Sequence, residues 1–437
     1  MEIKYIRKRD GSTQDFDLRK IEEAITKALA ETREGEPEAA EAVAATALER
    51  VVALCQQAPT AEPGSPHYGK CIDGYPSVEE IQDEVEAALM AHDFFHTAKA
   101  YILYRSERQK LRERDIFKKR VNLKPYEYPE LYEYVEAIRH SYWIHTEFSF
   151  TSDVNDYKVN ATTVEQSALK NAMLAIAQVE VAVKTFWGKI YDKMPKPEID
   201  AVGATFAESE VRHMDAYSHL LELLGLNYEF TKIRDIPALH QRVSYLDRTT
   251  ALARTEDNRQ YLQSVLLFSL FIEHVSLFSQ FLIIMSFNKH KNLFKGMSNA
   301  VEATSKEEQI HGLFGIEIIN LVRTERPEWF DEEFRTQVEA ACREAYESES
   351  VVVDWILEAG ELDFLSKAEI KEFIKNRFNN SLVAIGYEKI FDTDEKLLEN
   401  TEWFDNEVIA TKHVDFFDKR SINYNKRQQS VTADDLF

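Results

Sequence analysis

The sequence predicts a mainly α-helical protein, in which a long helical bundle follows a small α+β unit. Glycine is rare, with 13 among 437 residues, and most of the chain carries apolar residues at helical spacing. Only the first segment differs. Residues 3–9 and 12–17 flank an Asp-Gly pair, which is typical of a β-hairpin. The length exceeds what one typical domain needs, so we expect at least two units.

The chain is acidic, with a formal net charge of −23 from 53 Lys and Arg against 76 Asp and Glu. No strongly basic block stands out, which argues against a nucleic-acid partner. The three cysteines form no Cys-x-x-Cys pair, which argues against a zinc ribbon and fits a reducing, cytoplasmic compartment. The N-terminal segment lacks the apolar region of a signal peptide, so none is expected.

Residues 265–287 form the most apolar stretch and are long enough to span a bilayer. The stretch contains Glu273, His274 and Gln280, and it lies between segments with the pattern of soluble helices. We therefore predict a buried core helix and no membrane association.

The hairpin is followed by four predicted helices. Ser77 and Glu80 form a capping-box pattern at the start of the third helix, and a loop rich in Pro and Gly precedes it. The fourth helix ends in a strongly charged run. These elements predict a compact unit over residues 1–105, with residues 106–120 as a linker or a continuation of the helix.

Three segments, KRDGSTQDFDLRKI, SVEEIQDEVEAALM and TAKAYILYR, occur in this order at the spacing of one small domain. Together they resemble the ATP-cone, the nucleotide-binding domain that regulates ribonucleotide reductases. The resemblance implies ATP and dATP as effectors, and the basic side chains suit a triphosphate. It places phosphates at Lys8, Arg9, Lys20 and Lys99, and sugar or base near Gln14, Asp17 and Gln82. Arg105 is either a further phosphate ligand or a solvated charge.

Two distant segments, ESEVRHMDAY and SKEEQIHGLFG, each contain a Glu-x-x-His motif. Residues at i and i+3 share one helix face, so each motif presents a carboxylate and an imidazole together. One copy alone would indicate an exposed charged face. Here each copy also follows an isolated glutamate in an apolar helix, where an ionised carboxylate is costly without a cation. This is the dinuclear carboxylate pattern of ferritin-like bundles. The predicted ligands are Glu180, Glu210, His213, Glu273, Glu308 and His311.

With HSYWIHTEF and the terminal SINYNKRQQSVTADDLF, the region from residue 121 resembles the radical-generating β subunit of class I ribonucleotide reductase. The resemblance implies a ferritin-like domain over residues 121–410 and a tail, 411–437, that docks on the catalytic α subunit. It also implies a homodimer and two iron or manganese ions per chain. Tyr217 then matches the radical tyrosine, Trp143 the start of the radical-transfer route, and Tyr424 the tail tyrosine. Glu307 matches the acidic residue between that tryptophan and the metal-bound histidine.

Several positions depart from the family pattern. Glu180 and Glu307 stand where aspartate is usual, and Leu277 and Thr304 stand where Phe and Ile are common around the radical tyrosine. The oxidant is therefore expected either on Tyr217 or on the metal pair. The cone is also unusual in preceding the radical generator, which suggests that dATP inhibits by driving dimers into larger oligomers.

Other functions remain open at this point. A ferritin-like oxidase with a nucleotide-sensing domain needs the same ligands but neither Trp143 nor Tyr424. An iron-storage protein gives no reason for a cone. The chain is too short for the catalytic α subunit, and it lacks the zinc-ribbon cysteines of the cone-bearing transcription repressor.

Overall fold

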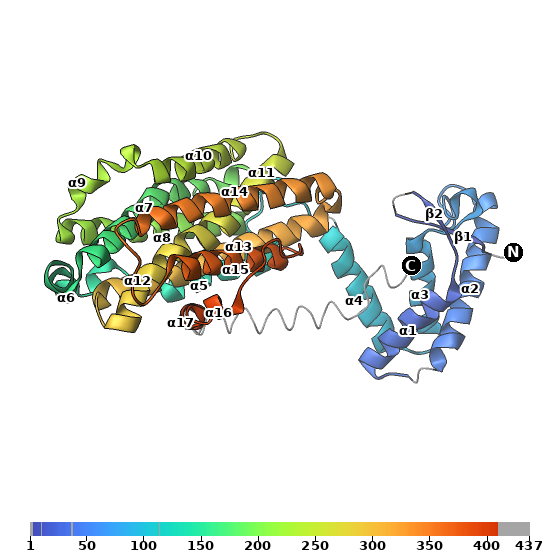
Figure 1. The fold of residues 1–437 in the computed structure, drawn as a ribbon. Helices are drawn as coiled ribbons and strands as arrows, with labels where there is room; N and C mark the ends of the chain where they lie inside the picture. The colour runs from blue at the N-terminus through green and yellow to red at the C-terminus, as the bar shows by residue number, and fades with distance from the viewer. Residues whose placement is uncertain (1–2, 10, 36–37, 113, 410–437) are drawn as a thin grey trace. The chain divides into compact units, whose positions relative to one another are not determined.

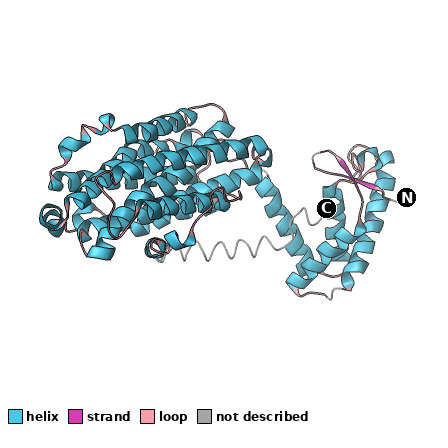
Figure 2. Cartoon of the chain, viewed as in Figure 1, coloured by secondary structure: helices cyan, strands magenta, loops and turns pink. Residues whose placement is uncertain are grey.

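The computed structural model describes residues 3–9, 11–35, 38–112 and 114–409. Of residues 107–108, 110–112, 180–184, 230, 234 and 409 it describes the backbone only. The described residues form two compact units, one ending at Arg114 and the other beginning at Asp115. Helices dominate both units, and within the described ranges the strands belong to the first unit (Figures 1 and 2).

The N-terminal hairpin consists of two short antiparallel strands, β1 (Tyr5–Arg7) and β2 (Thr13–Asp15), with Ile6 opposite Gln14. The connection spans residues 8–12 and is longer than the two-residue turn that the Asp-Gly pair predicts. The Lys8 amide donates to the Ser12 carbonyl at 2.7 Å, and Gly11 takes a φ of +85°. A left-handed conformation of this kind favours glycine.

Four helices complete the first unit: α1 (Leu18–Thr32), α2 (Ala39–Gln57), α3 (Val78–Ala91) and α4 (Phe95–Arg112), with the short turns η1 (Ala58–Thr60) and η2 (Ile72–Gly74). Their apolar faces share one core, in which Ile25, Leu29 and Ile81 are fully buried. The residues predicted as a linker, 106–120, include the end of α4.

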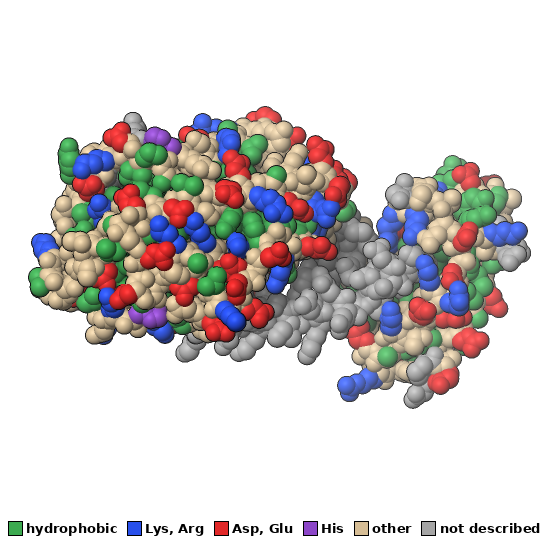
Figure 3. All heavy atoms as spheres, in the orientation of Figure 1, with side chains coloured by type: hydrophobic (Ala, Val, Ile, Leu, Met, Phe, Trp, Pro, Cys, Tyr) green, Lys and Arg blue, Asp and Glu red, His purple; other side chains and the backbone are tan. Residues whose placement is uncertain are grey.

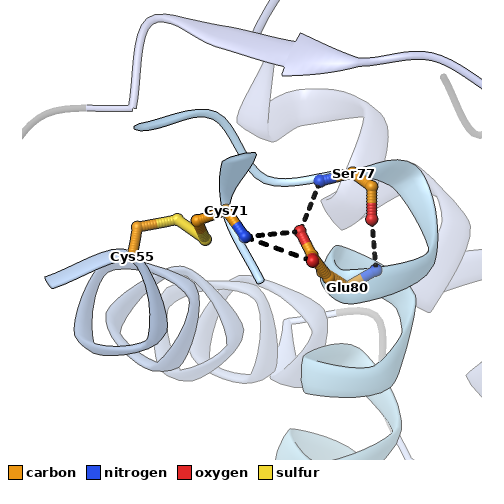
Figure 4. The surroundings of a disulfide bond; sticks show 4 residues. All are labelled: Cys55, Cys71, Ser77 and Glu80. Atoms are coloured by element: carbon orange, nitrogen blue, oxygen red, sulfur yellow. Dashed lines mark hydrogen bonds between the residues drawn. A yellow bond between two sulfur atoms is a disulfide. The ribbon is translucent and has the colours of Figure 1, made fainter. Parts of the chain in front are cut away.

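A disulfide and a buried carboxylate fix the loop that leads into α3 (Figure 4). Cys55 is bonded to Cys71, a pairing that the sequence analysis did not predict. Glu80 accepts hydrogen bonds from the backbone amides of Cys71 and Ser77, and the Ser77 hydroxyl accepts one from the Glu80 amide. This confirms the predicted capping box. The same glutamate therefore caps α3 and anchors the disulfide loop.

The second unit is a helical bundle (Figure 1). Neighbouring helices pack along their lengths, with α7 against α8, α12 against α13, and α5 against α8. Its helices are α5 (Pro129–Ser141), α6 (Thr151–Asn155), α7 (Thr163–Trp187), α8 (Pro197–Leu224), α9 (Asn227–Phe230), α10 (Pro237–Leu252), α11 (Asn258–Leu266), α12 (Leu277–Lys291), α13 (Lys295–Glu325), α14 (Glu332–Ile356), α15 (Lys367–Ala384), α16 (Glu395–Leu398) and α17 (Glu402–Ile409). Short 3-10 helices are η3 (His145–Glu147), η5 (Ile190–Asp192), η6 (Ile233–Asp235) and η8 (Pro327–Trp329), and two segments are π-helical, η4 (Asp156–Asn160) and η7 (Leu267–Ser276).

The most apolar segment lies at the centre of this bundle. Residues 258–291 run continuously through α11, η7 and α12, and the apolar part that could span a membrane is entirely buried. It is therefore a core helix, as predicted. Its middle section, η7, is a π-helix. A Cβ atom on Gly315 of α13 would lie 2.0 Å from the Ser269 hydroxyl oxygen, so glycine allows α13 to approach η7 closely.

A buried ion pair joins four helices of the bundle. Arg242 of α10 donates to both carboxylate oxygens of Glu349 on α14. It also donates to the Ala175 carbonyl on α7 and to the Gln280 side chain on α12. Arg242 and Glu349 are each 2% exposed. A buried guanidinium depends on such partners, because a charge without compensation is costly in the interior.

Replacing Glu349 by Ala leaves the Arg242 guanidinium buried without its carboxylate. We expect the free energy of unfolding, measured by urea denaturation, to fall by about 3–5 kcal/mol. The control is Glu344→Ala, which removes the exposed partner of Arg248. This variant should change the free energy of unfolding by less than about 1 kcal/mol. Equal losses in the two variants would contradict the structural role of the buried pair.

Candidate metal centre

Four side chains converge in the interior of the bundle, each offering one ligand atom within 4.8 Å of the others. All four are fully buried. Three helical segments supply them, namely α8, η7 and α13. The four residues are Glu210, Glu273, Glu308 and His311.

The two histidines are oriented alike. His213 directs Nδ1 toward the carboxylates, 3.0 Å from Glu308, and its Nε2 lies 2.8 Å from Glu307. His311 directs Nδ1 toward the same group, and its Nε2 lies 3.0 Å from the Ser209 hydroxyl. Each ring is thus fixed by one nitrogen and presents the other to the cluster, which is the usual arrangement around metal-binding histidines.

Two of the carboxylates lie between the histidines. Glu210 places Oε1 3.0 Å from His311 Nδ1 and Oε2 3.3 Å from His213 Nδ1. Glu308 places Oε1 3.0 Å from His213 Nδ1 and Oε2 3.3 Å from His311 Nδ1. Each carboxylate therefore faces both imidazoles. These residues would together be able to hold metal ions, since Glu210 and Glu308 each lie within reach of both histidine rings.

The charges of the cluster call for a cation. Burial raises the pKa of Glu273 well above its ordinary value. Burial alone would also raise the pKa of Glu210. Contacts with His213 and His311 outweigh burial and lower the pKa of Glu210 below its ordinary value. Burial opposes a charge on His311, yet Glu308 and Glu210 raise its pKa to about 10. Without a metal, protons on the histidines thus compensate the carboxylates.

Several buried atoms of the cluster are in ion-pair contact but make no hydrogen bond, namely both oxygens of Glu308, one oxygen of Glu210 and Nδ1 of His311, and one oxygen of Glu273 also makes none. Buried polar atoms are rarely left without a partner. Because these atoms converge, they fit metal ligation, and their carboxylate and imidazole donors suit iron or manganese. The sixth predicted ligand, Glu180, lies on α7, but its side chain is outside the described residues.

Sequence reasoning missed three residues around the cluster. Trp187 of α7 donates from its indole Nε1 to Glu273 Oε1 at 2.5 Å. Ser209 holds His311, and Arg212 binds Glu307. Ser209 and Arg212 lie within ESEVRHMDAY, and Trp187 lies at the end of α7. The sequence shows neither the burial of these three side chains nor the residues that they contact.

Two of the predicted radical-route residues, Trp143 and Glu307, contact His213. Trp143 is 4% exposed, and its ring stacks on His213 with centroids 5.8 Å apart and an interplanar angle of 15°. Glu307 contacts His213, as the resemblance implies, but the Trp143 indole nitrogen has no hydrogen-bond partner. Tyr217 is buried one turn after His213 on α8. Tyr424 lies outside the described residues. The roles of these residues stay predictions.

The environment expected for Tyr217 contains Leu277 and Thr304, and both are fully buried. The Thr304 hydroxyl donates to the Ala300 carbonyl of its own helix at 3.1 Å. Its hydrogen is therefore used within α13.

The residues predicted to contact a nucleotide lie on several elements of the first unit. Arg9 donates to Glu79 at 2.5 Å and to Gln82 at 3.5 Å. Asp17 is the N-cap of α1 and accepts from the Arg19 amide. Arg105 is bound by Asp83 and Glu86 of α3, so it already has carboxylate partners. Lys8 lies in the hairpin loop, Gln14 on β2, Lys20 on α1 and Lys99 on α4. Their roles also stay predictions.

The bundle and its buried carboxylate–histidine cluster place the second unit among ferritin-like proteins with a candidate metal centre. The family model "Ribonucleotide reductase, small chain" matches residues 120–400, and the model "ATP cone domain" matches residues 4–62 and 69–110. The chain therefore belongs to the ribonucleotide reductase small-chain family and carries an ATP-cone before the small-chain domain.

Individual proteins agree with this family. The probable ribonucleoside-diphosphate reductase small subunit of Invertebrate iridescent virus 6 is 28% identical over 71% of this chain and 95% of its own length. A shorter match is to the vitamin B12-dependent ribonucleoside-diphosphate reductase of Thermoplasma acidophilum. The two sequences are 37% identical over a stretch that covers 25% of this chain and 13% of that protein. The dimanganese(II) NrdF structure of Streptococcus sanguinis covers 65% of this chain and 99% of its own, with a TM-score of 0.56 and 15% identity, and supports the fold.

Metal analysis should find about two transition-metal ions per chain, the usual content of a dinuclear site. Glu210→Ala or His311→Ala should lower the content to one ion or none, because each removes a side chain that faces the cluster. Glu208→Ala, an exposed change on the same helix, should leave it unchanged. Full occupancy in the first two variants would contradict the ligand assignment.

Metal binding should weaken as the pH falls. With a pKa of about 10, His311 carries a proton at neutral pH, and metal ligation requires the neutral imidazole. The apparent Kd for Mn²⁺ should therefore rise about tenfold per pH unit for each proton displaced. Calorimetry between pH 6 and 9, in buffers with different ionisation enthalpies, measures both the affinity and the protons released. A pH-independent Kd would disprove the proton competition.

Proposed function

We propose that this chain is the radical-generating subunit of a class I ribonucleotide reductase, and that its own N-terminal cone regulates it. The observation that carries the proposal is the parallel stacking of Trp143 on His213 at the edge of the buried carboxylate cluster. A storage protein or an oxidase with a small substrate has no need of a tryptophan at this place. The stacking gives an electron path between the cluster and the side of the bundle where Trp143 lies.

The residues of the cluster prepare a dry, fixed site. Glu210, Glu273 and Glu308 supply negative charge, and Glu307 and Ser209 fix the rings of the two histidines. When bound, two iron or manganese ions supply the one-electron redox chemistry. The surrounding burial excludes water, which protects an oxidised state. We propose Glu180 as the remaining ligand, since α7 packs against α8.

In the proposed route, Trp143 exchanges an electron with the centre, and Tyr424 continues the route to the catalytic α subunit. The tail, residues 411–437, is proposed to dock on that subunit. A small chain of this family works with a large catalytic chain, and the sequence order of Trp143, Tyr217 and Tyr424 supports the same division of labour. The oxidant is stored either on Tyr217 or on the metal pair.

We also propose a homodimer, because apolar side chains are exposed on and beside α8. Val211, Leu223 and Tyr228 are 38%, 37% and 72% exposed.

On the face of the second unit that Figure 3 shows, acidic and basic side chains are interspersed, so this face has no continuous basic patch that would suit a nucleic acid. The family supports the proposed cytoplasmic location, whereas the Cys55–Cys71 disulfide differs from what a reducing compartment favours.

The cone is proposed to bind ATP and dATP. Arg9 already spans Glu79 and Gln82, and an incoming phosphate would compete with Glu79 for its guanidinium. An effector shifts an equilibrium only through different affinities for two states. The 2′-hydroxyl, which distinguishes the two nucleotides, must therefore favour different cone arrangements, and dATP is proposed to favour a larger, inactive oligomer.

Trp143→Phe and Tyr424→Phe remove an easily oxidised group and keep an aromatic ring. Both variants should bind metal normally and reduce ribonucleotides only at background rates when mixed with the α subunit. Trp329→Phe and Tyr68→Phe, at positions away from the proposed route, serve as matched controls and should retain activity. Near-normal turnover of the Tyr424 variant would rule out the proposed route.

Deleting residues 1–114 should leave reductase activity and abolish its inhibition by dATP. Coupling between a cone and an active assembly is typically about 1–3 kcal/mol. Light scattering of the full chain at saturating nucleotide should give a larger mass with dATP than with ATP. Identical masses would exclude the oligomerisation mechanism, and nucleotide binding would then need a different readout.

A further inference from the structure

Arg212 contacts both the backbone of Trp143 and the Glu307 carboxylate, and each of its guanidinium nitrogens donates a hydrogen bond. Nη1 donates to the Trp143 carbonyl at 3.0 Å and to Glu307 Oε2 at 3.2 Å. Nη2 donates to Glu307 Oε1 at 3.1 Å. Nε donates to Glu208 at 2.9 Å. The side chain is only 5% exposed, so these contacts are made largely out of water.

The hydrogen bonds of Glu307 show why this arginine matters. Its Oε2 is also in contact with His213 Nε2 at 2.8 Å, and its Oε1 also accepts from the Ser141 hydroxyl at 3.2 Å. The indole nitrogen of Trp143 is buried and has no hydrogen-bond partner. Glu307 therefore does not hold Trp143 directly. Among the described residues, Arg212 donates both to Glu307 and to the Trp143 carbonyl, and so links the carboxylate to the backbone of the tryptophan.

We propose that Arg212 is a positioning residue for electron transfer, which fixes both Trp143 and Glu307 against His213. This inference rests on the proposed function. In the transfer one electron leaves the Trp143 ring for the oxidised centre and is replaced from the Tyr424 side. Arg212 neither gains nor loses an electron or a proton in this step.

The guanidinium suits this task because it is planar and its two terminal nitrogens can donate parallel hydrogen bonds to one carboxylate. One arm binds the backbone beside the ring, and both arms bind the carboxylate that orients His213. The side chain also lies over the exposed ring of Tyr142, 4.6 Å from its centroid, which restricts its movement. A misplacement of about 1 Å at a reacting pair can cost about a hundredfold in rate.

The test measures metal content, the Kd for the α subunit, KM for the nucleotide and kcat in three variants. Arg212→Gln removes the charge and the fork, and Arg212→Lys keeps the charge but loses the fork. We expect both to bind two ions and the α subunit normally, with unchanged KM. The kcat should fall at least tenfold in Arg212→Gln, and Arg212→Lys should recover part of it. Glu208→Gln, which removes only the exposed partner of Arg212, should stay within twofold of the unaltered chain.

Two results would overturn the inference. One is a kcat within twofold of the unaltered chain in Arg212→Gln. The other is a loss of metal or of α binding, in both Arg212 variants, that matches the loss of activity, because this would mean a purely structural role.

Trp143→Phe, measured in the same assay, separates this inference from the function on which it rests. If Trp143→Phe is inactive while Arg212→Gln is active, only the role of Arg212 fails. If Trp143→Phe turns over normally, the radical route itself fails.

Discussion

The second unit depends on one electrostatic constraint, namely several carboxylates gathered in an apolar interior. Glu210, Glu273, Glu308 and the nearby Glu307 are fully buried, and charges of one sign are stable there only when cations compensate them. Protonated His213 and His311 can do so in the metal-free chain, and two metal ions would do so more completely. Arg212 compensates Glu307 from the outer side.

Rigid helices hold the carboxylates and the histidines of the cluster at fixed positions. Each Glu-x-x-His pair lies on a long helix, α8 or α13, so its two side chains keep a fixed separation. The π-helix η7 brings Glu273 to the same place, and Gly312 and Gly315 allow α13 to lie close to it: a Cβ atom on Gly312 would be 2.9 Å from the His274 ring. Trp187 then fixes Glu273 from α7. The result is a site held by four helical segments.

Much of this was predictable from the sequence, and the limits have physical causes. The i and i+3 spacing fixes geometry within one helix, so the two motifs predicted four ligands. The isolated Glu273 was predicted because a lone carboxylate is costly in an apolar helix. Contacts between distant segments, such as Ser209 with His311 or Arg212 with Trp143, depend on how the helices pack. The sequence contains no local signal for them. The bond between Cys55 and Cys71 was missed for the same reason.

The cone and the bundle are separate units. In the proposed function, the bundle supplies an oxidising equivalent that a second chain uses. The most direct test is reduction of a ribonucleoside diphosphate by the cognate α subunit, with and without the metal-loaded chain. We expect that neither chain alone forms a deoxyribonucleotide and that the mixture does, in proportion to the metal content of this chain. Equal product formation by the α subunit alone, or no product from the metal-loaded mixture, would contradict it.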